Sequence, residues 1–144
     1  MSKNSSVFDC TLITFDKNHQ IKGNLTAVVN GNQIPFDVKR IYYLYDVPGG
    51  LSRGGHAHIE LQQLIVALSG CFDITLDDGN ARRTFQLSRP NIGLLIPPGL
   101  WRELNNFSSG SICLVLASHE YDEGDYIRDY SSYLSYVKNE ITSL

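Results

Sequence analysis

The sequence lacks the features that mark a disulfide-linked, nucleic-acid-binding or membrane protein. It has three cysteines among 144 residues, without CxxC spacing, and this odd count indicates reduced thiols and no disulfide or metal framework. The net charge of -3 and the pI near 5.7 give no basic surface for nucleic acid. No apolar run approaches the length of a membrane span, and residues 1–6 are too polar for a signal peptide. These absences predict a cytoplasmic protein that associates with neither nucleic acid nor membrane.

What the chain does contain is a series of short apolar segments separated by glycine, proline and asparagine turns. Strands are predicted at residues 7–15, 25–29, 38–47, 71–76, 82–87, 92–96, 101–107 and 111–117, with another from His56 through residues 64–68. Residues 16–24 are polar and predict a loop. From about residue 125, apolar residues recur at helical spacing. The chain is therefore expected to form one all-β domain over residues 1–144, a small β-barrel or jelly roll with a short C-terminal helix.

Two histidines stand where a glycine-rich loop leads into the apolar run at residues 64–68. His56 and His58 are two residues apart, so a β-strand would point both imidazoles at the same face. A histidine pair on one strand face makes either a metal site or an acid–base site. The pair is the first candidate functional site.

Two segments carry the histidine pair and an arginine at fixed distances from glycine and proline. In the first, Gly50 is followed by five residues, His56-Ala57-His58, four residues, Gln63, six residues and Gly70. In the second, Pro97-Pro98-Gly99 is followed by two residues, Arg102, three residues and Asn106. These spacings resemble the two sequence motifs of the cupin superfamily, although the glycine that opens the second motif is out of register. The resemblance implies a cupin fold, a double-stranded β-helix or jelly-roll barrel.

Two departures from the cupin pattern argue against a metal ion. Gln63 stands where a metal-binding cupin has a carboxylate, and Arg102 stands where it has a third imidazole. Gln63 is a weak neutral donor, and Arg102 is a permanent cation that cannot ligate a metal. The expected site has no metal and no other cofactor. Its remaining side chains, with Trp101 beside Arg102, suit an anionic or oxygen-rich ligand and proton transfer near neutral pH.

Three segments narrow the resemblance further. They are Arg-Gly-Gly-His-Ala-His at 53–58, Gly-Leu-Leu-Ile-Pro-Pro-Gly-Leu-Trp at 93–101, and residues 117–130, which include Tyr-Asp-Glu-Gly-Asp-Tyr-Ile-Arg. Over about residues 7–136 the chain resembles the dTDP-4-keto-6-deoxyglucose 3,4-ketoisomerase family of metal-independent, WxcM-like sugar-nucleotide cupins.

This resemblance implies a cytoplasmic, homodimeric isomerase. It would convert dTDP-4-keto-6-deoxyglucose into a dTDP-3-keto-6-deoxyhexose through an enediolate. In that family the product feeds an aminotransferase that makes dTDP-3-amino-3,6-dideoxyhexoses for lipopolysaccharide O-antigen and other bacterial surface glycans.

The resemblance also implies roles for individual side chains. His56 is expected to be the base that carries the carbon-bound proton, while His58 hydrogen-bonds the sugar oxygens or moves a proton between O3 and O4. Tyr42, His58 and Arg102 are the candidates to stabilise the enediolate charge. Arg40 shares a strand face with Tyr42, as the period of two requires, and is a contact for substrate or diphosphate.

Four further residues complete the expected substrate-binding set. Arg53, in the glycine loop, is a second candidate for the diphosphate because guanidinium pairs bidentately with phosphate. Lys22 is a candidate contact for the sugar, and Gln63 and Trp101 are candidates through their places in the cupin motifs. Three of these side chains also have a structural interpretation: Lys22 as a surface lysine, Gln63 as a contact between strands, and Trp101 as a core indole.

Other functions stay open at this level. A dTDP-4-keto sugar 3,5-epimerase shares the barrel and the proton abstraction beside the ketone, but no catalytic acid for C5 can be located by spacing. A non-catalytic nucleotide-sugar-binding cupin and a metal-dependent cupin are the alternatives from other classes. The sequence does not give the C4 configuration of the product, the final glycan or the division of roles between the histidines.

Overall fold

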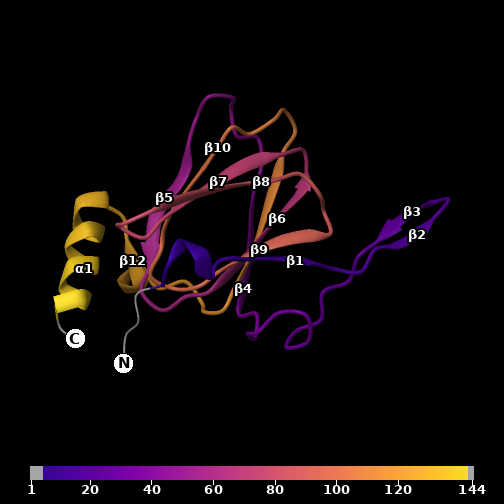
Figure 1. Cartoon of the computed structure of the whole chain (residues 1–144). Helices are drawn as coiled ribbons and strands as arrows, with labels where there is room; N and C mark the ends of the chain where they lie inside the picture. The colour runs from indigo at the N-terminus through magenta and orange to yellow at the C-terminus, as the bar shows by residue number, and fades with distance from the viewer. Residues whose placement is uncertain (1–4, 143–144) are drawn as a thin grey trace.

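Two five-stranded antiparallel sheets lie face to face in the computed structural model, which describes residues 5–142 and side chains as far as residue 139 (Figure 1). The first sheet has the order β1 (Thr11–Thr14), β9 (Ile92–Ile96), β6 (Gln63–Ser69), β11 (Ile112–Ala117) and β4 (Arg40–Leu44). The second has the order β12 (Tyr126–Ile127), β5 (Arg53–His58), β10 (Trp101–Asn105), β7 (Phe72–Asp77) and β8 (Arg82–Leu87). This arrangement confirms the predicted all-β cupin barrel.

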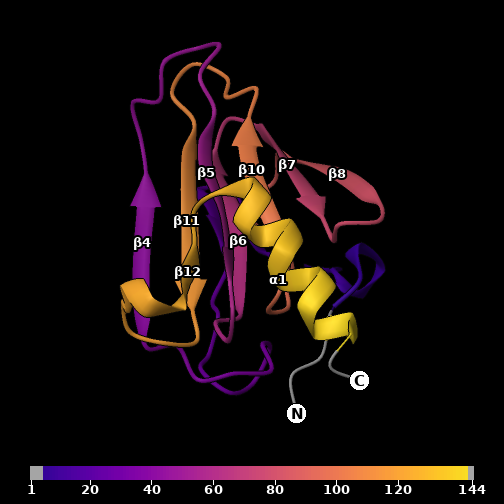
Figure 2. The same cartoon turned by 90° about the vertical axis from the view of Figure 1, so that its left-hand side faces the viewer.

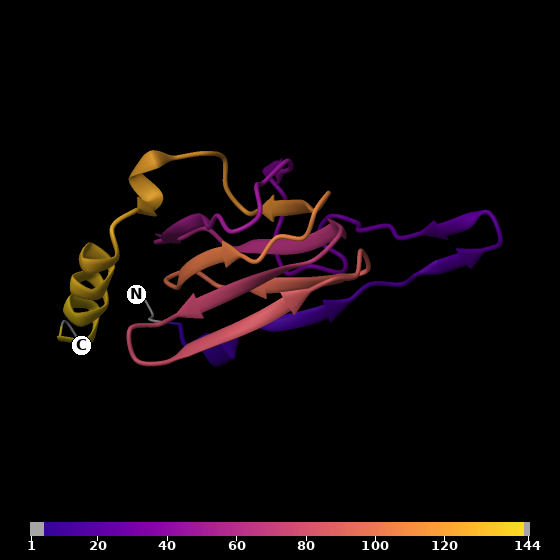
Figure 3. The same ribbon diagram turned by 90° about the horizontal axis from the view of Figure 1, so that it is seen from above.

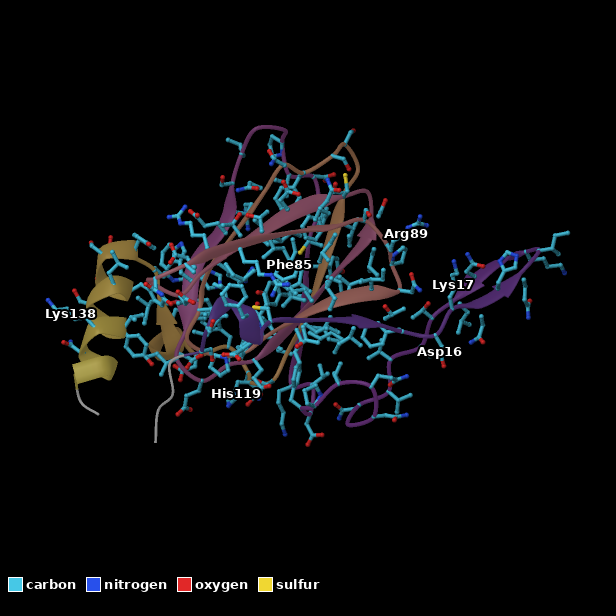
Figure 4. The ribbon with its side chains drawn as sticks, in the orientation of Figure 1. Asp16, Lys17, Phe85, Arg89, His119 and Lys138 are labelled. Carbon is cyan, nitrogen blue, oxygen red and sulfur yellow. The ribbon has the colours of Figure 1, made fainter. Side chains whose placement is uncertain are left out.

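The main core fills the space between the two sheets. Ile65 and Ala67 of β6 and Ile74 of β7 are fully buried in it, and Phe85 of β8, labelled in Figure 4, belongs to the same cluster. The alternate residues of β6, Leu64 and Val66, pack on the outer side of the first sheet against a cover formed by residues 15–36. Residues 64–67 of β6 are buried on both faces of the sheet, which accounts for the apolar run seen there in the sequence.

A two-stranded hairpin extends away from the barrel. It consists of β2 (Asn18–Gln20) and β3 (Gly23–Leu25) and projects at the end opposite the C-terminal helix (Figures 1 and 3). Figure 4 shows Asp16 and Lys17 at the base of this hairpin, where the chain leaves β1. The expectation of a loop over residues 16–24 is wrong, since this hairpin occupies most of that segment. The strands were not predicted because both of their faces are exposed, so no apolar alternation marks them in the sequence.

The C-terminal helix covers the outer face of the second sheet. Helix α1 (Tyr130–Thr142) begins after Asp129, whose carboxylate accepts a hydrogen bond from the Ser132 amide at 2.9 Å. The helix lies over the sheet that contains β5 and β10 (Figure 2). Its buried Tyr133 packs with Trp101 of β10 and Ala57 of β5. The sequence predicts the helix correctly, but places its start several residues early. Within the described residues, no helix is both long and apolar enough to cross a membrane.

Several predicted strands differ from those observed. The predicted strand at 7–15 is a 3-10 helix at Val7–Asp9 followed by β1, and the predicted strand at 101–107 ends at Asn105. Residues 26–29 form no strand. The predicted strand from His56 to residue 68 is two strands, β5 and β6, which lie in different sheets.

Candidate active site

A cavity of about 390 Å³ opens between β4, β5, β10 and the segment at residues 121–128. It is lined by Arg40, Tyr42, Leu44, Ser52, Arg53, Gly54, His56, Arg102, Leu104, Tyr121, Tyr126 and Arg128. This described lining contains four guanidinium groups and no carboxylate, so the cavity has a positive potential that suits an anionic ligand. A larger hollow of about 590 Å³ lies on the outer face of β4 and β11, but its lining includes no histidine or arginine.

The two histidines lie on the inner face of β5, next to this cavity. Alternation along the strand turns His56 and His58 inward and Ala57 outward, under the C-terminal helix. The two imidazole rings meet edge to face with centroids 4.7 Å apart, and Tyr126 packs against both, with centroids 4.9 and 4.3 Å away. His56 contributes to the cavity wall, whereas His58 does not.

Arg102 links the histidine pair to Tyr42. Antiparallel pairing of β10 with β5 places Arg102 directly opposite His56, so the two cupin-like segments meet across one pair of strands. The Arg102 Nη2 group donates to the Tyr42 hydroxyl at 2.9 Å and lies 3.1 Å from His56 Nε2. Arg102 is only 2% exposed, yet its Nε and Nη1 atoms have no hydrogen-bond partner among the described residues. Arg102 therefore presents a buried cation with donor atoms that no described residue satisfies.

Both histidines are held in the neutral form. Burial, followed by the charge of Arg102, lowers the pKa of His56 from 6.5 to about 2. Burial, Arg102 and Arg40 lower the pKa of His58 to about 3. At neutral pH each imidazole therefore has one unprotonated nitrogen, and on His56 the contact with Arg102 identifies that nitrogen as Nε2.

The other arginines lie among tyrosine rings at the cavity wall. The Arg40 guanidinium lies 4.5 Å from the centre of the Tyr42 ring, and its Nη1 group donates to the Tyr126 hydroxyl at 3.3 Å. Arg128 lies 4.2 Å from the centre of the Tyr126 ring and donates to both carboxylate oxygens of Glu123, at 2.8 and 2.9 Å. The Glu123 carboxylate therefore balances the charge of Arg128, whereas no such ion pair is seen for Arg40 or Arg102 among the described residues.

The structure brings together five of the predicted site residues at the cavity. These are Arg40, Tyr42, Arg53, His56 and Arg102. His58 lies directly behind His56.

The remaining three predicted residues do not line the cavity; they are Gln63, Lys22 and Trp101. Gln63 is buried at the start of β6, on the strand face that carries the core residues Ile65 and Ala67. Its Oε1 atom has no partner among the described residues, but the side chain does not line the cavity. Lys22 lies in the turn of the projecting hairpin, away from β5 (Figure 1).

The expectation that the Trp101 indole faces the cavity disagrees with the structure. The indole packs outside the sheet against Tyr130 and Tyr133 of α1, with ring centroids 5.3 and 5.9 Å away. Adjacent residues of a strand point to opposite faces, so Trp101 and Arg102 cannot both line one cavity.

The cavity wall also contains three residues that are not among the predicted site residues. They are Tyr121, Tyr126 and Arg128, which reach the cavity because β12 pairs with β5. The segment at residues 121–128 was the most specific part of the family resemblance, and that signal could have identified it as part of the site.

No metal centre is evident among the described side chains. No three histidine, cysteine, aspartate or glutamate residues within this part of the chain gather closely enough to hold an ion. Arg102 sits opposite His56 across the two strands, where its charge would repel a divalent cation. The donor set at this position therefore does not fit a metal ligand sphere.

Comparisons with known proteins agree with this geometry. Residues 8–138 match the family model described as FdtA, WxcM-like, C-terminal. The chain is 42% identical over 126 residues to a TDP-4-oxo-6-deoxy-alpha-D-glucose-3,4-oxoisomerase of Aneurinibacillus thermoaerophilus, covering 88% of this chain and 91% of that protein.

Solved structures with the same fold include two enzymes of similar sequence. A 3,4-ketoisomerase from Helicobacter canadensis is 45% identical with a TM-score of 0.88, and the match covers 90% of this chain and 98% of that one. A histidine-to-asparagine mutant of the 3,4-ketoisomerase QdtA from Thermoanaerobacterium thermosaccharolyticum, in complex with TDP-4-keto-6-deoxyglucose, is 37% identical with a TM-score of 0.90. That match covers 93% of this chain and 97% of the other.

Proposed function

The chain belongs to the FdtA family of WxcM-like proteins, as its sequence motifs predict, and we propose that it is a dTDP-4-keto-6-deoxyglucose 3,4-ketoisomerase. The observation that carries this proposal is the contact of Arg102 with both His56 and Tyr42 in a cationic cavity. This arrangement combines a neutral imidazole, a phenol and a buried cation, which together suit proton transfer through an anionic intermediate.

The reaction moves the ketone from C4 to C3 without any change in composition. His56 removes the proton from C3, which the C4 ketone acidifies, and an enediolate forms across C3 and C4. Return of a proton to C4 and transfer of the O3 proton complete the isomerisation. His56 suits the role of base because its imidazole is neutral and its ring forms part of the cavity wall. To take the C3 proton, its Nε2 atom exchanges the hydrogen bond from Arg102 for that proton.

Arg102 is placed to stabilise the enediolate. Its unpaired Nε and Nη1 donors meet the negative charge in a buried site, where electrostatic interactions are stronger than in water. Tyr42 receives a hydrogen bond from the same guanidinium, so its own hydroxyl proton is free to be donated to the sugar. The enediolate charge also raises the pKa of His56 from its low value in the empty cavity, which helps the imidazole to hold the abstracted proton.

The remaining arginines suit the diphosphate of a nucleotide sugar. Arg40 and Arg53 lie at the cavity wall with no described carboxylate paired to them, and guanidinium is the preferred protein partner for phosphate oxygens. Lys22 is too far along the hairpin to serve the cavity of its own chain, so its proposed contact with the sugar requires a second copy.

A homodimer is part of this proposal. The larger apolar hollow is lined by three exposed side chains: Ile41 and Tyr43 on the outer face of β4, and Tyr45 just after it, which are 60%, 59% and 62% exposed. Exposed apolar surface of this kind favours association, and the projecting hairpin could reach a neighbouring copy. A sedimentation-equilibrium mass equal to one chain would contradict the dimer. We further propose a cytoplasmic location and a role in making 3-amino-3,6-dideoxyhexoses for surface glycans such as the O-antigen.

The activity is tested by proton NMR of dTDP-4-keto-6-deoxyglucose incubated with the protein in heavy water. The expected product is a 3-keto sugar, with deuterium at C4 where the abstracted proton exchanges with solvent, and its coupling constants give the C4 configuration. Exchange at C5 would indicate a 3,5-epimerase instead. Binding without exchange at C3, C4 or C5 would indicate a non-catalytic binding protein.

Two variants make the assay specific for the proposed base. His56→Asn keeps the size and hydrogen bonding of the side chain but removes its basicity, so turnover is expected to be lost while binding of dTDP persists. His119→Asn is the matched control, because His119 is exposed and lies outside the cavity. Wild-type turnover by the His56→Asn variant would show that His56 is not the base.

A further inference from the structure

Asp125 lies behind His58, on the side away from the cavity lining. Its Oδ2 atom is 3.4 Å from His58 Nδ1, and its side chain is 15% exposed. The pairing of β12 with β5 produces this proximity, because Tyr126, the next residue, is directly opposite His58. Asp125 itself does not line the cavity.

The turn that follows β5 holds the Asp125 carboxylate in place. Its Oδ1 atom accepts a hydrogen bond from the Glu60 amide at 2.8 Å, and its Oδ2 atom accepts one from the Leu61 amide at 3.2 Å. The Ile59 amide donates to the Asp125 carbonyl oxygen at 3.0 Å. Three backbone contacts therefore fix an anionic side chain against a histidine ring.

His58 needs such a partner. It is 3% exposed, and neither ring nitrogen makes a hydrogen bond with any described residue. The other titratable or charged groups around it come from four strands and the following loop: His56, Tyr126, Arg102, Arg40 and Arg128. Among the described residues, Asp125 supplies the carboxylate within ion-pair distance of the ring. An N–H group at Nδ1 would face this carboxylate, whereas a lone pair there would be repelled by it.

We propose that Asp125 is a positioning residue that holds neutral His58 in the tautomer with its proton on Nδ1, which leaves Nε2 as a proton acceptor. The catalytic use of the Nε2 acceptor rests on the proposed function, whereas the tautomer itself does not. In the ketoisomerase reaction, Nε2 takes the O3 proton of the enediolate and returns it to O4, a step that requires the sugar to contact His58 beyond the cavity wall formed by His56. The Nδ1 proton stays on His58. Asp125 is neither protonated nor consumed in this step.

The tautomer can be measured directly. Two-bond ¹H–¹⁵N spectra of the ¹⁵N-labelled protein at pH 7 distinguish the two neutral tautomers, and the signals lost in His58→Gln identify those of His58. The wild-type protein is expected to carry the His58 proton on Nδ1. A proton on Nε2 would overturn the proposal, and this measurement needs neither a variant of Asp125 nor any turnover.

Asp125→Asn tests the cause. Its carbonyl oxygen can still accept from the Glu60 amide, but its NH₂ group then faces Nδ1 as a donor, so the His58 proton is expected to move to Nε2. We expect kcat to fall about 10²-fold, because a positioned acid–base group contributes about 10²- to 10⁴-fold, with KM changed less than about 3-fold. An unchanged tautomer together with an unchanged kcat would overturn the proposal.

Asp122→Ala is the control for loosening the 3-10 helix at Glu123–Asp125, which carries Asp125. Asp122 Oδ1 accepts from the Gly124 amide at 3.0 Å, so this variant removes a contact within that helix while leaving the Asp125 carboxylate beside His58. The His58 tautomer is expected to be unchanged, and a change equal to that in Asp125→Asn would mean that Asp125 acts only through the conformation of this helix. If the wild-type protein has the expected tautomer but does not isomerise the substrate, the proposed function fails and the positioning role of Asp125 stands.

Discussion

The two buried histidines should make this fold sensitive to mild acid. Both have pKa values lowered from 6.5 in the folded chain, to about 2 for His56 and about 3 for His58. The unfolded chain therefore binds more protons than the folded chain once the pH falls below about 6.5. The free energy of unfolding must then decrease as the pH is lowered, and it continues to decrease until the folded-state pKa values are reached.

The magnitude follows from proton linkage. Between pH 7 and pH 5, an unfolded histidine becomes almost fully protonated, whereas the folded histidines bind almost no proton. Integration over this interval gives a loss of about 2 kcal/mol for each histidine and about 4 kcal/mol for the pair. A single domain is typically stable by about 5–15 kcal/mol, so this loss is a large fraction of the total. Asp78 and Asp129, whose pKa values are also lowered, titrate in the unfolded chain near 3.8 and contribute mainly below this interval.

Urea unfolding at pH 7, 6 and 5 measures the effect. The protein has one tryptophan, Trp101, which is buried under α1 and reports unfolding by its fluorescence. Protein concentration and ionic strength must be constant, because association would also change the apparent stability. The double variant His56→Asn/His58→Asn should lose most of the pH dependence, and His119→Asn should retain it. A wild-type loss below about 1 kcal/mol, or an equal loss in the double variant, would refute the reasoning.

Two substitutions test the packing outside the cavity. A Cβ atom at Gly93 would lie 2.8 Å from Leu64 Cδ1, so Gly93→Ala should lower the free energy of unfolding by about 1–3 kcal/mol. Gly49→Ala is the control and should have little effect, because a Cβ atom there would have no neighbour within 4 Å. Equal urea midpoints for the two variants would contradict this prediction. Trp101→Phe should lower the free energy of unfolding by about 1–3 kcal/mol through lost contact with Tyr133, while KM for the nucleotide sugar stays within about 2-fold. A tenfold higher KM at unchanged stability would place the indole in the substrate site.

The sequence predicts the fold well where one face of a strand is buried and the other is not. The hairpin β2–β3 was missed because both of its faces are exposed, so no alternation marks it. The strand predicted at 25–29 fails for a different reason. The Gln33 side chain accepts from the Val29 amide at 2.6 Å and donates to the Ala27 carbonyl at 3.1 Å, so it occupies backbone groups that a strand partner would need.

The candidate site could be located because its two motifs lie on paired strands. The cupin resemblance put His56 and Arg102 in one cavity although they are far apart in sequence, and the structure shows them directly opposite in the β5–β10 register. The partners of His58 could not be found in this way. Tyr126 lies in β12, and Asp125 lies in the turn before it. Because β12 has only two residues, it is too short to give a periodic signal in the sequence.

The acid sensitivity of the fold and the proposed chemistry have the same physical origin. Burial, and then the charge of Arg102, lowers the pKa of His56 and His58, so both imidazoles are neutral at pH 7 and their protonation in mild acid favours the unfolded chain. The Nε and Nη1 atoms of Arg102 are buried and have no hydrogen-bond partner among the described residues, so they can stabilise a negative charge next to them. Such a charge also makes protonation of His56 easier, because it offsets the charge of Arg102. In the proposed reaction, the guanidinium that helps to keep the base neutral therefore also stabilises the enediolate.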